Sequence, residues 1–126
     1  MVLLRIVAAV LLVAHGLVHL LYLAHDVREF SLDQSWLVPQ RARRPLALGL
    51  IVATVAAFTI LALAVLGIPG LLAAWPGLTV LACTLSMVLL ILFWNRWLVF
   101  GLSIDIALLA LAVIRPGWLE QFVSQR

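Results

Sequence analysis

Two histidines and one aspartate are unusual in this sequence because each lies inside a long apolar run. His15 and His19 are four residues apart, so they share one face of a helix. Asp105 is the only acidic residue inside any apolar run. A charge at the centre of a bilayer costs about 2.5–3.5 kcal/mol on insertion scales. Asp105 must therefore find a partner or be protonated, and we expect these three residues to carry any chemistry.

Imidazole and carboxylate groups in this setting have three uses, and the sequence leaves all three open. They can form interhelical hydrogen bonds, they can pass a proton or an ion, or His15 and His19 can ligate a metal or a haem. In the last case Asp105 would handle a proton or orient a ligand. All three histidines, His25 included, belong to the first apolar run or its end. A haem held between two helices of one copy would need a histidine on a second run.

The polar residues of the first run lie on one line along a helix, because positions three or four residues apart share a face. Six of the eight positions on this line are polar or ionisable. The line consists of Arg5, Ala8, Leu12, His15, His19, Tyr22, Asp26 and Glu29. Lipid offers such a stripe no partner, so it must face the bundle interior or a water-filled path. Tyr22 and Asp26 therefore join the candidates for binding or for a proton or ion path.

Estimated depth places His15 and Asp105 together. With a rise of about 1.5 Å per residue, Asp105 lies roughly 13 Å from the turn at Arg96. On the same scale His15 lies roughly 16 Å from Asp26, on the same side of the membrane. We expect a contact between His15 and Asp105, with His19 one turn nearer the first loop.

Four apolar runs position these residues, and they predict an all-α integral membrane protein. Of the 126 residues, 67% are hydrophobic and 10% are charged, against about 45–50% and about 25% in soluble domains. About 20 apolar residues cross the hydrocarbon core as a helix. The expected spans are 2–24, 45–66, 72–93 and 98–114, with a polar loop at 25–44. They form one transmembrane domain, 1–126, as a four-helix bundle.

Proline, glycine and tryptophan support these boundaries. Pro45 is expected to open the second span, and the turn at 67–70 to close it. A short amphipathic helix over 27–38 is expected at the interface. All five tryptophans fall at or outside span ends, where the headgroup level suits their half-polar ring. They are Trp36, Trp75, Trp94, Trp97 and Trp118.

Small and hydroxyl residues predict helix packing. Gly49, Ala53 and Ala57 form a ladder that lets another helix approach closely, in this copy or a neighbouring one. Thr79, Cys83 and Ser86 share a face of the third span, and we interpret that face as packing.

The charge pattern addresses location and partners. All eight basic residues are arginines spread over loops and ends, which excludes the clustered basic face of a nucleic-acid site. More of them flank the loop 25–44 and Arg96 than the other side. The positive-inside rule therefore favours a multi-pass protein of the plasma membrane with this loop in the cytoplasm. Arg41, Arg43 and Arg44 are expected to anchor it to lipid headgroups.

A resemblance rests on two short motifs and the length. The run His-Gly-Leu-Val-His-Leu from His15 and the pattern Phe-Gly-x-x-x-Asp from Phe100 resemble small four-span bacterial integral membrane proteins with an HGxxH-type first helix. This resemblance implies a four-helix bundle in a bacterial inner membrane and carries no activity.

Two classes of function remain. The first is a non-enzymatic bundle, either an accessory subunit of a membrane complex or a self-associating, transport-like protein. Its partners are the lipid bilayer and other membrane subunits or itself. The second is a membrane redox, metal-binding or haem-binding protein that uses His15 and His19. The chain has no HExxH, no Cys-x-x-Cys, no nucleophile elbow and no Gly-rich phosphate loop, which favours the first class.

Overall fold

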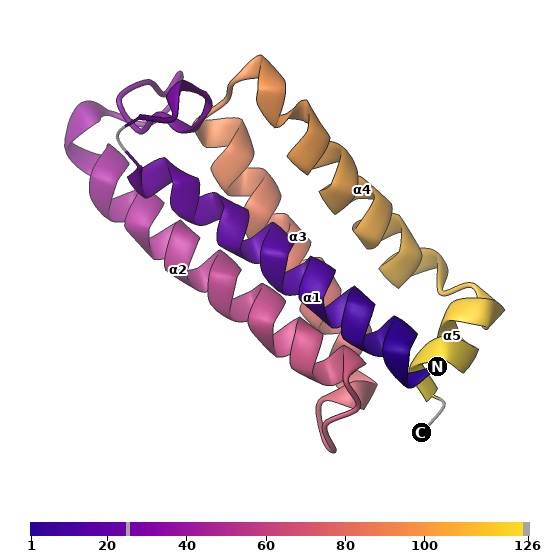
Figure 1. The fold of residues 1–126 in the computed structure, drawn as a ribbon. Helices are drawn as coiled ribbons and strands as arrows, with labels where there is room; N and C mark the ends of the chain where they lie inside the picture. Colours follow the sequence, from indigo (N-terminus) through magenta and orange to yellow (C-terminus); the bar gives the residue numbers. More distant parts are fainter. Residues whose placement is uncertain (25, 125–126) are drawn as a thin grey trace.

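The computed structural model describes residues 1–24 and 26–124, and this part of the chain is helical without strands. The α-helices are α1 (Val2–Val18), α2 (Gln40–Val65), α3 (Trp75–Leu92), α4 (Val99–Ile114) and α5 (Gly117–Ser124) (Figure 1). Short 3₁₀ helices are η1 (His19–Leu23), η2 (Arg28–Phe30), η3 (Leu72–Ala74) and η4 (Arg96–Leu98). Four segments have the length and composition to cross a membrane: Val2–Leu23, Gln40–Val65, Leu72–Leu92 and Arg96–Ile114.

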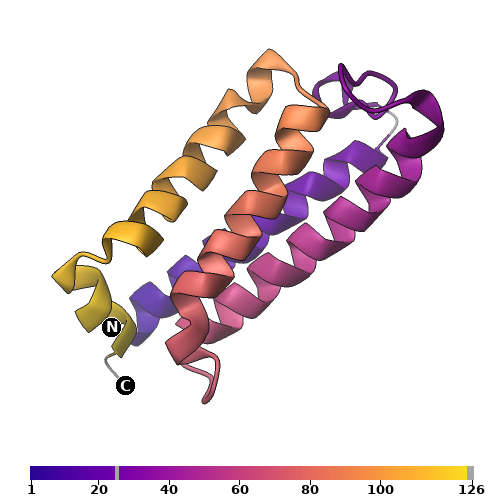
Figure 2. The same ribbon diagram turned by 180° about the vertical axis from the view of Figure 1, so that it is seen from behind.

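The four long helices pack in chain order. α1 packs on α2, α2 on α3 and α3 on α4, whereas α1 and α4 have almost no close backbone contact. Figure 2 shows α4 beside α3, on the opposite side from α2. The bundle is therefore least tightly closed along the seam between its first and last spans.

Two apolar clusters form the core, and a polar layer separates them. One cluster includes Phe58, Leu61 and Cys83, and the other includes Ile51 and Leu89. Along α2, the buried Thr54 lies between the two clusters, and along α3 the buried Ser86 does so. The core thus has a polar level near the middle of the bundle.

The second span begins earlier than the sequence suggested. α2 starts at Gln40, so Pro45 lies in its second turn and residues 40–44 belong to the helix, not to the loop. Pro45 only removes one backbone donor close to the helix start, where a proline is tolerated better than deeper inside. Arg43 holds the preceding chain to this first turn: its guanidinium donates to the carbonyl oxygens of Asp33, Ser35 and Val38. Arg43 therefore holds residues 33–38 against the start of α2, and its expected role as a headgroup anchor stays a prediction.

The expected interfacial helix over 27–38 is wrong. Only the single turn η2 is helical there. The chain instead satisfies the free carbonyl groups at the end of α3, which a helix end leaves without intrahelical partners. Ser35 Oγ donates to the carbonyl of Leu92 at 2.6 Å, and Trp36 Nε1 donates to that of Ile91 at 2.7 Å. The candidate His25 lies outside the described residues.

The five tryptophans differ in their exposure. Trp36, Trp94, Trp97 and Trp118 are exposed, whereas Trp75, at the start of α3, is buried.

α5 was not expected. It follows a left-handed residue, Arg115 (φ 50°), which ends α4. Arg5 Nη2 donates to the carbonyls of Phe122 (3.1 Å) and Val123 (2.6 Å) in α5.

The predicted small-residue ladder is only partly covered within the chain. Ala57 is buried and Ala53 is partly buried, but Gly49 is exposed. A Cβ atom added to Gly49 would meet nothing within 4 Å. Among the described residues, no helix lies against the Gly49 end of the ladder.

Gly16 is the glycine on which close packing of α1 and α2 depends. A Cβ atom here would lie 2.8 Å from Phe58 Cβ, an atom that moves only with its backbone. We predict that Gly16→Ala lowers the thermal stability of the purified protein, because overpacking of about 1–3 kcal/mol exceeds the helix-propensity gain of about 1 kcal/mol. The matched control, Gly49→Ala in α2, should leave the midpoint of thermal unfolding unchanged or raise it. Equal midpoints for the two variants would contradict the prediction.

Candidate functional site

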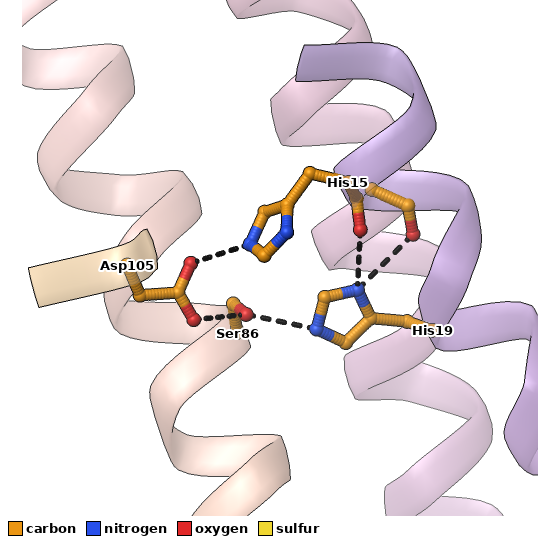
Figure 3. A network of polar contacts seen from close by, with 5 residues as sticks. His15, His19, Ser86 and Asp105 are labelled. Carbon is orange, nitrogen blue, oxygen red and sulfur yellow. Dashed lines mark hydrogen bonds and ion pairs between the residues drawn. The ribbon is translucent and has the colours of Figure 1, made fainter. Parts of the chain in front are cut away.

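A chain of four side chains crosses the polar layer of the core (Figure 3). His15 Nε2 lies 2.8 Å from Asp105 Oδ1, and Asp105 Oδ2 lies 2.5 Å from Ser86 Oγ. Ser86 Oγ also lies 2.8 Å from His19 Nε2. We call His15, Asp105, Ser86 and His19 the polar network. Asp105 and Ser86 are fully buried and His19 almost so.

Four helical elements, which belong to three of the four span candidates, contribute to the network. His15 lies in the last turn of α1 and His19 begins η1, while Ser86 lies in α3 and Asp105 in α4. The network thus joins α1 to α4, which otherwise scarcely touch.

Aromatic and glycine residues fix the approach of the helices. The Phe58 ring stands edge-on to the His15 ring with centroids 5.0 Å apart, in the space that Gly16 leaves open. On the other side, a Cβ atom at Gly101 would lie 3.2 Å from Leu90 Cδ1. Gly16 and Gly101, the glycines of the two short motifs, therefore let α1 lie close to α2 and α4 lie close to α3.

The backbone determines one proton on His19. Its Nδ1 lies 3.1 Å from the carbonyl oxygens of both His15 and Gly16. Carbonyl oxygens only accept hydrogen bonds, so Nδ1 must carry a hydrogen and donate it. His19 Nε2 is then either the acceptor of a neutral ring or the second donor of a cationic ring.

Counting hydrogens across Ser86 reveals a shared proton. Its contacts with His19 and Asp105 need two hydrogens, and the hydroxyl supplies one. The second is on His19 Nε2, beside an ionised Asp105, or on Asp105 Oδ2, beside a neutral His19. In both arrangements the His19–Asp105 pair has zero net charge. Each arrangement becomes the other when two hydrogens shift along the bonds through Ser86.

His15 presents its two ring nitrogens to different surroundings. In these two arrangements, in which the His19–Asp105 pair has no net charge, Asp105 Oδ1 has no hydrogen, so His15 Nε2 donates to it. With a neutral ring, Nδ1 then carries a lone pair. No described residue forms a hydrogen bond with Nδ1, although the side chain is only 10% exposed. His15 also lines two cavities, one on each side of its bond with Asp105.

A metal or haem ligand role meets a specific obstacle at His19. Both of its ring nitrogens are engaged, one by carbonyl oxygens and the other by Ser86. His15 Nδ1 is the one histidine nitrogen of the network without a protein partner. Among the described residues, no three His, Cys, Asp or Glu side chains gather in a way that could hold a metal.

Other predicted residues lie away from the network. Tyr22 is buried, and its hydroxyl donates to the Phe93 carbonyl at 3.3 Å. Asp26 is exposed, because the first helical segment ends at Leu23 and the stripe does not continue beyond it. Thr79 and Cys83 are buried in packing positions, and Thr79 Oγ1 donates to the Trp75 carbonyl. Ser86, which shares their face, is the network residue whose role the sequence reading missed.

Comparison with protein-family models, with curated proteins and with solved structures gives no match. The geometry of the polar network therefore carries the functional argument alone.

The His15–Asp105 contact predicts energetic coupling. We expect Asp105→Asn, His15→Ala and the double variant to give a coupling free energy of about 1–3 kcal/mol, because either single change leaves a buried polar group unpaired. That range exceeds the average of about 0.6 kcal/mol for interhelical hydrogen bonds in membranes. The measurement is the free energy of unfolding in mixed micelles.

Ser103→Ala provides the control, because Ser103 is exposed on α4 and bonds only to the carbonyl of its own helix. Its effect should add to that of His15→Ala. Additive effects for His15 and Asp105 themselves would show that their contact carries no energy.

Proposed function

We propose that this protein is a non-enzymatic, four-span membrane protein that binds and releases a proton inside the bilayer through the polar network. The observation that carries the proposal is the position of Ser86, with His19 Nε2 at 2.8 Å and Asp105 Oδ2 at 2.5 Å. The two bonds need one hydrogen more than a neutral His19 and an ionised Asp105 supply. A proton is therefore held within the network and not by any one residue.

The order of groups allows protons to enter from His15. A hydrogen that arrives at His15 Nδ1 lets Nε2 pass its own hydrogen to Asp105 Oδ1. Asp105 can then release the hydrogen on Oδ2 to Ser86, and Ser86 passes its own to His19 Nε2. Every hydrogen bond reverses, no bond is lost and the network gains one positive charge. His19 is the inner end of this path, because its Nδ1 hydrogen is donated to carbonyl oxygens.

The setting suits proton exchange. A charge in the membrane interior is costly, and ionisable groups there typically mark proton or ion pathways. Apolar clusters flank the network on both sides. The proposed location is a bacterial plasma membrane with the loop 25–44 on the cytoplasmic side. The role fits a self-associating, transport-like bundle or an accessory subunit of a membrane complex.

Infrared spectroscopy tests the proposal directly. As the pH of the purified protein in nanodiscs is lowered, the carbonyl stretch of the protonated Asp105 carboxyl group should appear, if Asp105 starts ionised, or shift, if its hydrogen moves from Oδ2 beside Ser86 to Oδ1 beside His15. Asp105→Asn should abolish this band. Ser86→Ala should shift its frequency, because the carboxyl group loses its hydroxyl partner, and Ser103→Ala should leave it unchanged. A band that is absent, or that keeps the same frequency and intensity, at every pH at which the protein is folded would refute proton exchange at Asp105.

A measurement of proton flux distinguishes a transport-like bundle from an accessory subunit. In vesicles with an imposed pH gradient, a self-sufficient bundle, which needs an exit for the proton beyond His19, dissipates the gradient faster than empty vesicles do. Ser86→Ala should then slow the flux by about tenfold or more, which corresponds to a barrier about 1.4 kcal/mol higher. A wild-type protein that shows the infrared response without any flux would be the accessory form.

A further inference from the structure

A cavity of about 420 Å³ lies between α1 and α4, on the side of the network that faces α5. Its volume falls within the range of about 300–1,000 Å³ that is usual for small-molecule sites. The walls are almost wholly apolar. They include Ala8 and Leu12 of α1, Leu108 and Leu111 of α4, and Leu119 and Phe122 of α5. His15 lines the cavity from the network side.

The cavity opens toward lipid. Leu11 and Ile104 line it and are 64% and 47% exposed. In a membrane these side chains face the bilayer, since they lie within the helices that have the properties of spans. α1 and α4 scarcely pack against each other, so their seam leaves a lateral entrance. A molecule dissolved in the bilayer can enter without crossing water.

His15 brings a hydrogen-bond acceptor to the lining of the cavity. The His15 side chain is nine-tenths buried, and no described residue bonds to its Nδ1. Because Nε2 donates to Asp105, Nδ1 of the neutral ring is an acceptor. A ligand that donates a hydrogen bond to this acceptor gains an interaction that a purely apolar ligand does not make.

We propose that this cavity binds an apolar molecule with a hydroxyl head, which donates to His15 Nδ1 while its body lies between α1, α4 and α5. An ether or ester head has no hydrogen to donate. A carboxylate also has none, and it would bring a second negative charge close to Asp105. The site requires a neutral His15 ring with its hydrogen on Nε2 but no exchange of that hydrogen, so it can exist without the proposed function.

The test uses para-nonylphenol and its methyl ether, which differ in the one hydrogen that matters. Thermal unfolding of the protein in nanodiscs is followed as each probe is added, and binding raises the midpoint. We expect the phenol to stabilise the wild-type protein with an affinity at least about tenfold higher than that of the ether (about 1.4 kcal/mol). Equal affinities would overturn the proposal, because the hydroxyl would then have no acceptor.

Two substitutions of alanine by phenylalanine locate the site. Ala8→Phe fills the cavity from α1 and should abolish stabilisation by both probes. Ala110→Phe adds the same ring at an exposed position of α4 and should leave both responses intact. Undiminished stabilisation of Ala8→Phe would place the phenol elsewhere and refute the site.

His15→Phe tests the head group. It should retain the weak response to the ether and lose the extra response to the phenol. If this variant does not fold, the comparison of Ala8→Phe with Ala110→Phe still decides. The infrared response of Asp105 should persist in Ala8→Phe, so a failure of the cavity and a failure of proton exchange are distinguishable.

Discussion

The arrangement of the helices depends on Asp105. Its buried carboxyl group must find its hydrogen-bond partners within the protein, because neither lipid nor water supplies them there. Asp105 is fully buried in a helix with the properties of a membrane span. In such a place an unsatisfied polar group costs several kcal/mol. Each carboxyl oxygen of Asp105 forms one hydrogen bond: Oδ1 with His15 of α1, and Oδ2 with Ser86 of α3. Because α1 and α4 have almost no close backbone contact, the His15–Asp105 bond is a direct link between the first span and the last.

Packing around the network reinforces this arrangement. Helices in lipid gain little from the hydrophobic effect, so close van der Waals contact and hydrogen bonds hold them together. Gly16 provides such contact by admitting Phe58, whose ring also stands against His15. Apolar clusters on both sides keep the local dielectric low, which strengthens satisfied hydrogen bonds and penalises unsatisfied ones. The same surroundings that stabilise the network therefore make it sensitive to the loss of any member.

Hydropathy was enough to predict the four spans, and helix rise was enough to place His15 and Asp105 at one depth. The role of Ser86 was not predictable from its residue type, because span hydroxyls commonly bond to their own helix. Thr59, Thr79 and Ser103 all do so here. The stripe ended before Asp26 because the chain tightens into η1 after Val18, where a period of 3.6 no longer holds. The position of α5 and the contacts of Arg43 with residues 33–38 depend on tertiary hydrogen bonds. The periodicity of apolar residues in the sequence does not reveal such bonds.

The two nitrogens of His15 link the proposed proton site to the proposed cavity. Nε2 belongs to the network, and Nδ1 is an acceptor only while the ring is neutral. A proton that enters at Nδ1 turns that atom into a donor and reverses every bond as far as His19. A hydroxyl ligand that donates to Nδ1 therefore competes with proton entry, and by thermodynamic reciprocity proton entry weakens the ligand to the same extent. One imidazole between a cavity open to lipid and a closed polar core is sufficient for such coupling, without any movement of the helices.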